Sequence, residues 1–265
     1  MRRQGFSIGQ IAARLNVSES TAHWHVSDMR LTEKQRRDLR EQWRRRMAEV
    51  NGRRRGKALK HIAFQRPRWS GALVHLVAHL SFDGRVDRYG CHYYSRSKKQ
   101  VLHVRDLFSS LIGTVPTVRL RPNGIWTASC YHVEIAHWFA GREVELVTAV
   151  ADRPMWRQIW LKALFDDEGH IHVIRGHRRI RASQKDPSVL QAARGFLQQM
   201  SIESRMDYRA QALEITGRDN LELFRKLVNF SSGIRINGHR KNGLHHHDIE
   251  KRVLLDRALA SYRTA

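Results

Sequence analysis

Two stretches of the chain share one pattern of apolar and polar positions. Each is an apolar helical run with a small residue about two-thirds along it, then an acid, a glycine, and alternating polar and apolar residues. The stretches are WSGALVHLVAHLSFDGRV, from Trp69, and MWRQIWLKALFDDEGHIHV, from Met155. Because the alternation has the two-residue period of a strand, each copy predicts a buried helix that runs directly into a sheet.

The two copies align position by position. With Asp83 opposite Glu168, the small residues Ala78 and Ala163 coincide, and a glycine follows each acid. The similarity continues further along the chain. After a three-residue difference in length, residues 95–112 align with residues 183–200.

Each copy therefore predicts a helix, a strand pair, a second helix and further strands. The first copy is expected to have strands over 85–95, a helix over 99–112 and a hairpin over 115–133 that turns at Pro122-Asn123-Gly124. The second is expected to have strands over 170–182, a helix over 187–200, a strand over 208–216 and a helix over 219–228. Two such copies, over residues 69–150 and 151–265, make a pseudo-twofold α+β domain.

The N-terminal segment predicts a separate helical element over residues 1–30. Ile8, Ile11 and Leu15 form one helical stripe, and a second short helix follows the turn at residues 16–18. The spacing resembles the helix-turn-helix of bacterial regulators, and on that interpretation Ser20 and His23 belong to the face that enters the major groove of DNA. An ordinary helical hairpin remains the alternative.

The net charge of the chain indicates what kind of molecule it binds. The chain has 48 Lys and Arg against 25 Asp and Glu, a formal net charge of +23, which favours a polyanionic partner. Between Arg30 and Arg68 there are 15 basic residues against 4 acids. We expect a helix over 32–50, ended by NGRRRGK, within a basic helix and linker over residues 31–68. This segment is either a phosphate-binding arm or simply a solvated charged face.

Composition also excludes several classes of protein. No apolar run approaches the roughly 20 residues that span a bilayer, and the N-terminus lacks the apolar stretch of a signal peptide. Cys91 and Cys130 stand far apart without a CxxC pair, so neither a disulfide framework nor a structural zinc site is expected. We expect a protein without a membrane partner that acts in the cytoplasm, on nucleoid or organelle DNA.

The stretches LVAHLSFDG and LKALFDDEG resemble the two signature helices of LAGLIDADG homing endonucleases. The resemblance covers the chain from Trp69 onward and implies a pair of αββαββα repeats whose curved sheets form a DNA-binding saddle. His79 and Ser81 stand where the family more usually has apolar or acidic residues, and Glu168 replaces the commoner Asp. None of these departures removes the terminal carboxylate of either copy.

The two acids are the candidate catalytic and metal-binding residues. Helices that cross at Ala78 and Ala163 bring their C-terminal ends together, so Asp83 and Glu168 should meet there, beside the partial negative charge of both helices. Two carboxylates at one place favour a divalent cation, and oxygen ligands suit Mg²⁺, for which Mn²⁺ can substitute. The chemistry would be metal-assisted hydrolysis of phosphodiester bonds.

The resemblance implies two further catalytic residues. Gln184 matches the family position at which a Gln orders solvent beside the metal, and its partner in the first copy is Arg96. For the basic residue that assists near the scissile phosphate, the candidates are Lys241 and its neighbour Arg240. An ordinary basic surface loop is the alternative for that pair.

Basic and polar residues alternate with apolar ones along the expected strands, as on a sheet with one covered and one free face. Such faces lie in the major groove, where Arg can bind guanine edges and phosphates. The candidate DNA-binding residues of the two sheets are Arg85, Arg88, His92, Tyr94, Arg96, Arg119, Arg121, Arg175, His177, Arg179 and Arg181.

Together these features indicate a monomeric, site-specific endonuclease that cuts both strands of a long, non-palindromic double-stranded DNA site. Two alternatives use the same scaffold. One is a transcription regulator that binds DNA without cutting it, although such a protein has no reason to keep both acids. The other is a maturase that binds a host intron RNA.

Overall fold

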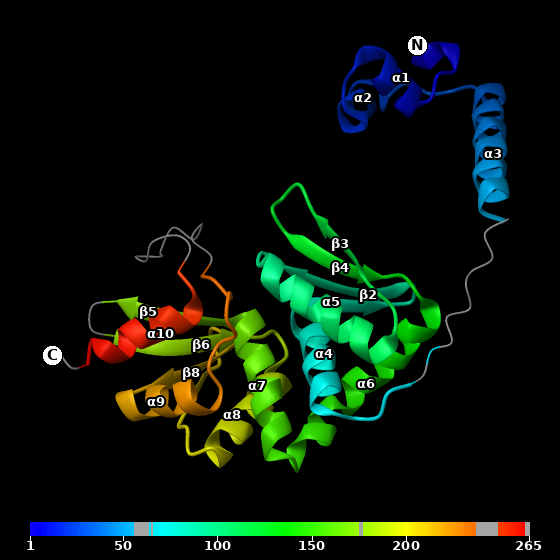
Figure 1. The fold of residues 1–265 in the computed structure, drawn as a ribbon. Coiled ribbons are helices and arrows are strands. Elements are labelled where there is room, and N and C mark those ends of the chain that lie inside the picture. Colours follow the sequence, from blue (N-terminus) through cyan, green and yellow to red (C-terminus); the bar gives the residue numbers. More distant parts are fainter. Residues whose placement is uncertain (56–63, 65, 175–176, 237–248, 263–265) are drawn as a thin grey trace. The chain divides into compact units, whose positions relative to one another are not determined.

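Two helices with buried central portions form the centre of the larger of two units. Helix α4 (Gly71–Phe82) starts at Ser70, whose hydroxyl accepts a hydrogen bond from the backbone N–H of Leu73 at 3.2 Å. Helix α7 (Pro154–Glu168) starts with proline, which suits the first helical position because its missing N–H has no partner there anyway. The two helices pack against each other, as Figure 1 shows.

The computed structural model describes residues 1–55, 64, 66–174, 177–236 and 249–262. The chain divides into two compact units, residues 1–62 and 63–265. Within the described residues, no helix is both long and apolar enough to cross a lipid bilayer.

The larger unit contains the same succession of elements twice. The first repeat comprises α4, β1 (Gly84–Asp87), β2 (Gly90–Ser95), α5 (Lys98–Ile112), β3 (Thr117–Leu120), β4 (Trp126–Cys130) and α6 (Val133–Ala151). The second comprises α7, β5 (Gly169–Ile174), β6 (His177–Ser183), α8 (Pro187–Gln199), β7 (Arg205–Asp207), β8 (Ala212–Thr216) and α9 (Arg218–Leu227), after which α10 (Lys251–Ala260) follows. The strand orders are β1-β2-β4-β3 and β5-β6-β8-β7, and all pairs are antiparallel. The prediction of paired αββαββα repeats is confirmed.

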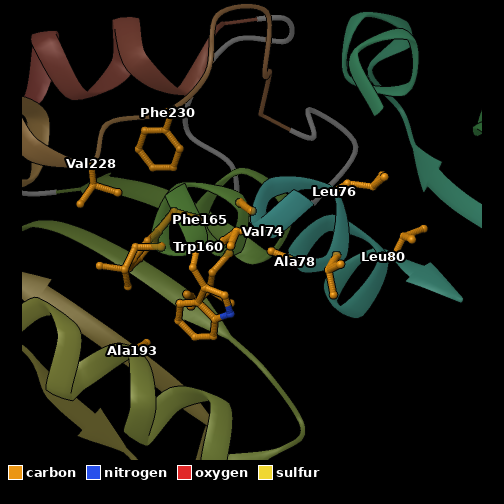
Figure 2. Close-up of a cluster of buried hydrophobic side chains, with 14 of the residues drawn as sticks. Val74, Leu76, Ala78, Leu80, Trp160, Phe165, Ala193, Val228 and Phe230 are labelled. Atoms are coloured by element: carbon orange, nitrogen blue, oxygen red, sulfur yellow. The ribbon is translucent and has the colours of Figure 1, made fainter. Parts of the chain in front are cut away.

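The core lies where the two helices meet. Ala78 of α4 and Ala163 of α7 have no exposed surface, and neither do the neighbouring side chains of Leu76 and Phe165. Figure 2 shows this cluster, in which Trp160 lies between the helices and α8. The small side chains of Ala78 and Ala163 permit close packing of the two helix backbones.

The register of the two repeats differs from the sequence alignment by one residue. Gly84 pairs with Tyr93 in the first sheet, and Gly169 pairs with Ala182 in the second, so the β5–β6 hairpin is longer. The residue equivalent to Gln184 is therefore Ser95, and the expected equivalence with Arg96 is wrong. A short polar hairpin carries little information on where its extra residues lie, which explains the error.

One expected strand is shorter than predicted and forms the second half of a hairpin. The stretch predicted as a strand over 208–216 contains only β8, which pairs with the short strand β7 that precedes it. The chain turns between them with Gln211 at a φ of 47°. Gln carries no turn signal of its own, unlike the Asn-Gly pair in the first repeat, where the hairpin prediction is confirmed.

The smaller unit is helical. Helices α1 (Ile8–Leu15) and α2 (Glu19–Val26) bury Ile11, Ala12 and Ala22 between them, and Asn16 makes the turn with a φ of 52°. Helix α3 (Glu33–Arg55) extends five residues beyond its expected end. A single glycine costs only about 1 kcal/mol in a helix, and the arginines that follow Gly52 are good helix formers.

Candidate metal centre and basic sheet faces

Each helix of the central pair ends in a candidate acid. Asp83 caps the C-terminus of α4, and Glu168 is the last residue of α7. The glycine that follows each acid is required by the backbone, because a Cβ on Gly84 would lie 2.3 Å from the carbonyl oxygen of Leu80 and one on Gly169 2.3 Å from that of Phe165. The chain thus turns from helix to strand immediately after each carboxylate, in the same way in both repeats.

The two carboxylates lie among other acids and are partly buried. Burial raises the pKa of Asp83 to about 8, and the charges of Asp167 and Glu168 add to the rise, while Lys251 opposes it. Burial likewise raises the pKa of Glu168 to about 7, with a further contribution from Asp167. Crowded carboxylates that resist ionisation form a set of oxygen donors that a divalent cation stabilises. The donor set therefore fits Mg²⁺ or Mn²⁺.

Gln184 lies beside this acid pair. Its Nε2 donates a hydrogen bond to Oε1 of Glu168 at 3.4 Å, and its Oε1 accepts one from the backbone N–H of Lys185 at 2.7 Å. The second bond fixes the orientation of the amide. Of the four residues expected to be catalytic, the structure brings together Asp83, Glu168 and Gln184, whereas Lys241 and its neighbour Arg240 lie outside the described residues.

A buried lysine near the acids had no signal in the sequence. Lys251, at the start of α10, is 6 % exposed, and its Nζ donates hydrogen bonds to the carbonyl oxygens of Phe165 (3.1 Å) and Asp166 (2.6 Å). Burial lowers the pKa of this amine, while four surrounding acids raise it. A cation at the C-terminal end of α7 stabilises the helix and offsets part of the negative charge there. In a sequence, a Lys-Arg pair at the start of a helix is typical of a solvent-exposed position, so the pattern did not indicate that Lys251 is buried.

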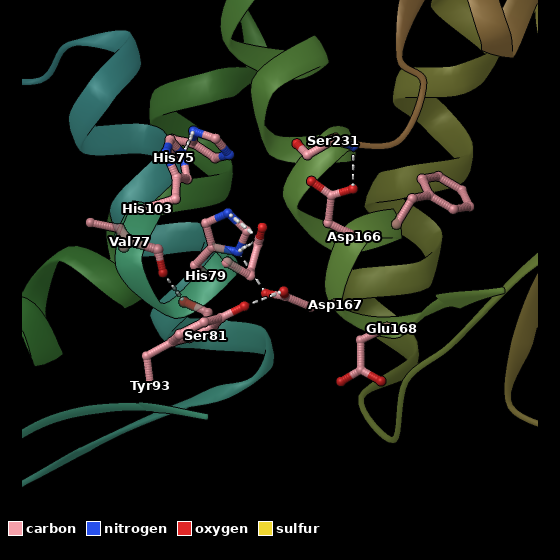
Figure 3. Close-up of polar contacts among 12 residues, drawn as sticks. His75, Val77, His79, Ser81, Tyr93, His103, Asp166, Asp167, Glu168 and Ser231 are labelled. Atoms are coloured by element: carbon pink, nitrogen blue, oxygen red, sulfur yellow. Dashed lines mark hydrogen bonds and ion pairs between the residues drawn. The ribbon is translucent and has the colours of Figure 1, made fainter. Parts of the chain in front are cut away.

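A second buried polar group connects the two repeats. The side chain of Asp167 is 1 % exposed, and its oxygens contact Nδ1 of His79 (2.7 Å) and the hydroxyl of Tyr93 (2.6 Å), which donates to it. The neighbouring Asp166 turns the other way and accepts a hydrogen bond from the backbone N–H of Ser231 at 2.8 Å. Figure 3 shows both contacts, with Glu168 beyond them. His79, which departs from the usual motif, has this carboxylate as its partner.

The strand register of the first sheet places several expected DNA-binding residues on one face. Arg85 is opposite His92, and Tyr94 and Arg119 both flank Thr127, so these side chains share the face away from the buried Tyr93. Arg88 lies exposed in the β1–β2 turn, with its guanidinium 4.5 Å from the centre of the Tyr89 ring.

The edge of the same face is formed by two more arginines. Arg121 is exposed at the start of the β3–β4 turn, with its guanidinium 4.8 Å from the centre of the Tyr94 ring. Arg96 is exposed just after β2. His92, in contrast, is 7 % exposed and bonded to Ser129 at 3.0 Å, so its side chain is not free to reach a ligand. Its neighbours Tyr94 and Tyr131 cover it, which alternation alone does not reveal.

The second sheet is basic but contains an unexpected acid. His177, Arg179 and Arg181 alternate along β6 on the face that also carries His170 and His172 of β5. On this face Glu214 of β8 is almost completely buried. Arg175 lies outside the described residues.

Glu214 binds the arginines around it. Arg179 lies 2.9 Å from its carboxylate, Arg181 3.6 Å and Arg205 2.7 Å. The carboxylate therefore offsets part of the positive charge on the second face and holds the guanidinium groups in place. In the N-terminal unit, Ser20 and His23 are both exposed on α2.

Comparisons with known proteins identify one family and several similar folds. Residues 156–229, from α7 to just beyond α9, match the LAGLIDADG-like domain. No curated protein matches the sequence. Similar solved structures include the homing endonuclease I-DmoI in complex with DNA and Ca, with a TM-score of 0.46, 14 % identity, and coverage of 61 % of this chain and 91 % of that one. Another is the N-terminal LAGLIDADG domain of DUF199/WhiA, with a TM-score of 0.48, 15 % identity, and coverage of 64 % and 89 %.

Proposed function

We propose that this chain, which carries a LAGLIDADG-like domain over residues 156–229, is a site-specific endonuclease that cuts both strands of DNA with the help of divalent metal ions. The DNA substrate is a long, non-palindromic duplex, because the two repeats differ in the residues on their sheet faces. The protein acts as a monomer, since one chain supplies both repeats.

One observation carries the proposal: each repeat ends its central helix in a partly buried carboxylate, and the charge of Glu168 raises the pKa of Asp83. The two acids occupy equivalent places, each before a glycine that the backbone requires. A protein that only binds DNA gains nothing from two partly buried acids near a polyanion. Their electrostatic cost is explained if they hold cations between the protein and the phosphates.

The surrounding residues have defined parts in this proposal. Asp83 and Glu168 hold Mg²⁺, or Mn²⁺ in its place, and such ions supply an activated water and stabilise the leaving oxygen. Gln184 orients solvent next to Glu168, to which its amide is already bonded at 3.4 Å. Arg85, Arg88, Arg119 and Arg121 of the first repeat, with Arg179 and Arg181 of the second, bind the DNA backbone and base edges.

Conservative replacement of the acids tests the proposal. Asp83→Asn and Glu168→Gln keep the size of each side chain and remove its charge. DNA sites are first selected for binding to the wild type in Ca²⁺ and then supplied as supercoiled plasmid in Mg²⁺. We expect each variant to retain binding in Ca²⁺ and to lose cleavage by orders of magnitude, because metal contacts supply much of the stabilisation of the transition state.

The chain contains a matched control for the first variant. Asp152 caps α6 with φ −99° and ψ 8°, close to the −99° and 11° of Asp83, but it is exposed. Asp152→Asn should leave cleavage unchanged, as should Glu203→Gln at an exposed acid of the second repeat. If Asp83→Asn and Glu168→Gln cleave as fast as these controls, the acids have no catalytic role and the proposal fails.

A further inference from the structure

Three histidines of the first repeat lie close together, away from the acid pair. His75 and His79 are one helical turn apart on α4, and His103 faces them from α5. Each offers one ring nitrogen, and the three nitrogens all lie within 4.8 Å of one another. No other group of three or more potential ligands this close occurs among the described residues. Figure 3 shows His103 next to His75, with His79 below them on the same helix as His75.

The distances suit a single ion. Bonds of about 2.0–2.1 Å in a tetrahedral zinc site place neighbouring ligand nitrogens about 3.3 Å apart. Nε2 of His103 already lies 3.4 Å from Nδ1 of His75. The remaining nitrogen–nitrogen distances, none above 4.8 Å, must each shorten by no more than about 1.5 Å to complete the site.

The hydrogen bonds of His79 leave the correct nitrogen available. Its Nδ1 is bonded to Asp167 at 2.7 Å, an arrangement that is usual when a carboxylate orients a metal-binding histidine. Its Nε2 lies 3.2 Å from the amide nitrogen of Gln100, which can only donate, so this contact is a hydrogen bond in the tautomer in which Nε2 carries a lone pair. A metal ion would take the place of that amide.

His75 supplies an independent observation. Its Nδ1 is the atom near His103, whereas its other ring nitrogen, Nε2, is buried and has no hydrogen-bond partner among the residues that the structure describes, so no protein acceptor holds a proton on Nε2 and fixes the tautomer of this ring. Burial lowers the pKa of this imidazole to about 2, with contributions from His79, His103 and Lys162, whereas the charge of Asp167 raises the pKa of His79 against the effect of burial, so a metal competes with a proton at His79. His103 is exposed and provides an entry path from solvent.

The second repeat shows that folding does not require these histidines. The positions equivalent to His75 and His79 in α7 are Trp160 and Leu164, which are completely or almost completely buried. The position equivalent to His103 in α8 is Ala192, which packs against the core. A largely apolar set thus fills the same place in the second repeat. The three histidines are an addition to one repeat, and their shared property is the ability to bind a metal.

We propose that His75, His79 and His103 bind one Zn²⁺ ion, with a water molecule from solvent as the fourth ligand. The ion links α4 to α5 in the first repeat, and through Asp167 the site is joined to the end of α7. Asp167 and Asp106 favour a cation here, whereas Lys162 opposes it. The sequence signal is the HLVAH spacing on α4, since two histidines at i and i+4 face the same way. The expectation that the chain has no structural zinc site considered only Cys91 and Cys130 and therefore missed these histidines.

Metal titration of the full-length chain tests this site. The protein is stripped with EDTA, and Zn²⁺ binding is measured by calorimetry, with Co²⁺ as a spectroscopic substitute that absorbs visibly in a tetrahedral site. Because the run His245-His246-His247 can also bind zinc, every protein carries alanine at these three positions. We expect one bound Zn²⁺ per chain, the absorption of tetrahedral Co²⁺, and a rise in melting temperature on adding zinc.

The variants decide whether the histidines are responsible. His103→Ala removes an exposed side chain and should reduce zinc affinity by at least about 100-fold, and Asp167→Asn by about 10- to 100-fold. His137→Ala, at an exposed position on α6, is the matched control and should bind like the parent. The proposal is overturned if the parent binds no zinc, or if His103→Ala binds it as tightly as His137→Ala. Asp83→Asn should leave zinc binding intact, which separates this site from the acid pair.

Discussion

At the scale of single residues, the acids make the metal-free protein sensitive to pH. The pKa of Asp83 is about 8 in the folded protein, against an ordinary value of 3.8, and that of Glu168 is about 7, against 4.5. Between the ordinary and the raised value of each acid, the folded state binds more protons than the unfolded state. The free energy of unfolding therefore falls as pH rises through this window, and the loss is complete above the folded pKa.

The fall of the free energy of unfolding with rising pH leads to a prediction for Asp83→Asn in EDTA. The variant cannot ionise, so its melting temperature relative to wild type should rise steadily from about pH 5 to about pH 8 and then level off. Glu168→Gln should show the same trend, ending near pH 7. Thermal melts across this pH range measure the effect, and a pH-independent difference for Asp83→Asn would contradict the crowding of the acids.

The two acids could be predicted from sequence because they repeat, whereas Gln184 was predicted only from the family resemblance. Asp83 and Glu168 stand out because two copies place an acid before a glycine at equivalent positions. Asp167 and Lys251 could not be found in this way, because each occurs in only one copy, and its role depends on what lies across the helix pair. Glu214 was missed for the same reason, since its meaning comes from three arginines on neighbouring strands.

At the scale of elements, the packing of α4 on α7 determines where the acids lie. Periodicity predicted both helices well because their apolar runs are long. The register between the repeats and the β7–β8 hairpin were less predictable, since short polar turns tolerate extra residues without changing the pattern. The two N-terminal helices were predicted from an apolar stripe and a short turn at residues 16–18, and the structure contains both, with Ser7 as the cap of α1 and Ser18 as the cap of α2.

Enlarging the small residues tests the helix pair. Ala78→Leu or Ala163→Leu adds volume where no space exists, so each should lower the free energy of unfolding by about 1–3 kcal/mol. Denaturant unfolding measures this change. Ala72→Leu, at an exposed position of the same helix α4, should be nearly neutral. Equal stability of all three variants would mean that the helices do not pack closely at the alanines.

At the scale of the whole molecule, the positive charge of the N-terminal unit should affect DNA binding. We expect deletion of residues 1–62 to reduce the slope of log affinity against log salt, by about 0.9 for each phosphate that the shortened protein no longer binds. Replacing Arg44, Arg45 and Arg46 of α3 with alanine should give a smaller change in the same direction. Salt titrations with a selected site measure both slopes. Unchanged slopes would show that the arginines of α3 face solvent and do not contact DNA phosphates.

The most direct test of the central claim is whether the wild-type protein cuts the DNA that it binds. A plasmid library with randomised inserts is divided, and one half is selected for binding in Ca²⁺ while the other is incubated in Mg²⁺ and its broken ends are sequenced. The account predicts that the same long, asymmetric sequence is enriched in both halves, with breaks in both strands at fixed positions within it. Tight, sequence-specific binding without any break in Mg²⁺ or Mn²⁺ would contradict it, and the protein would then be a DNA-binding regulator.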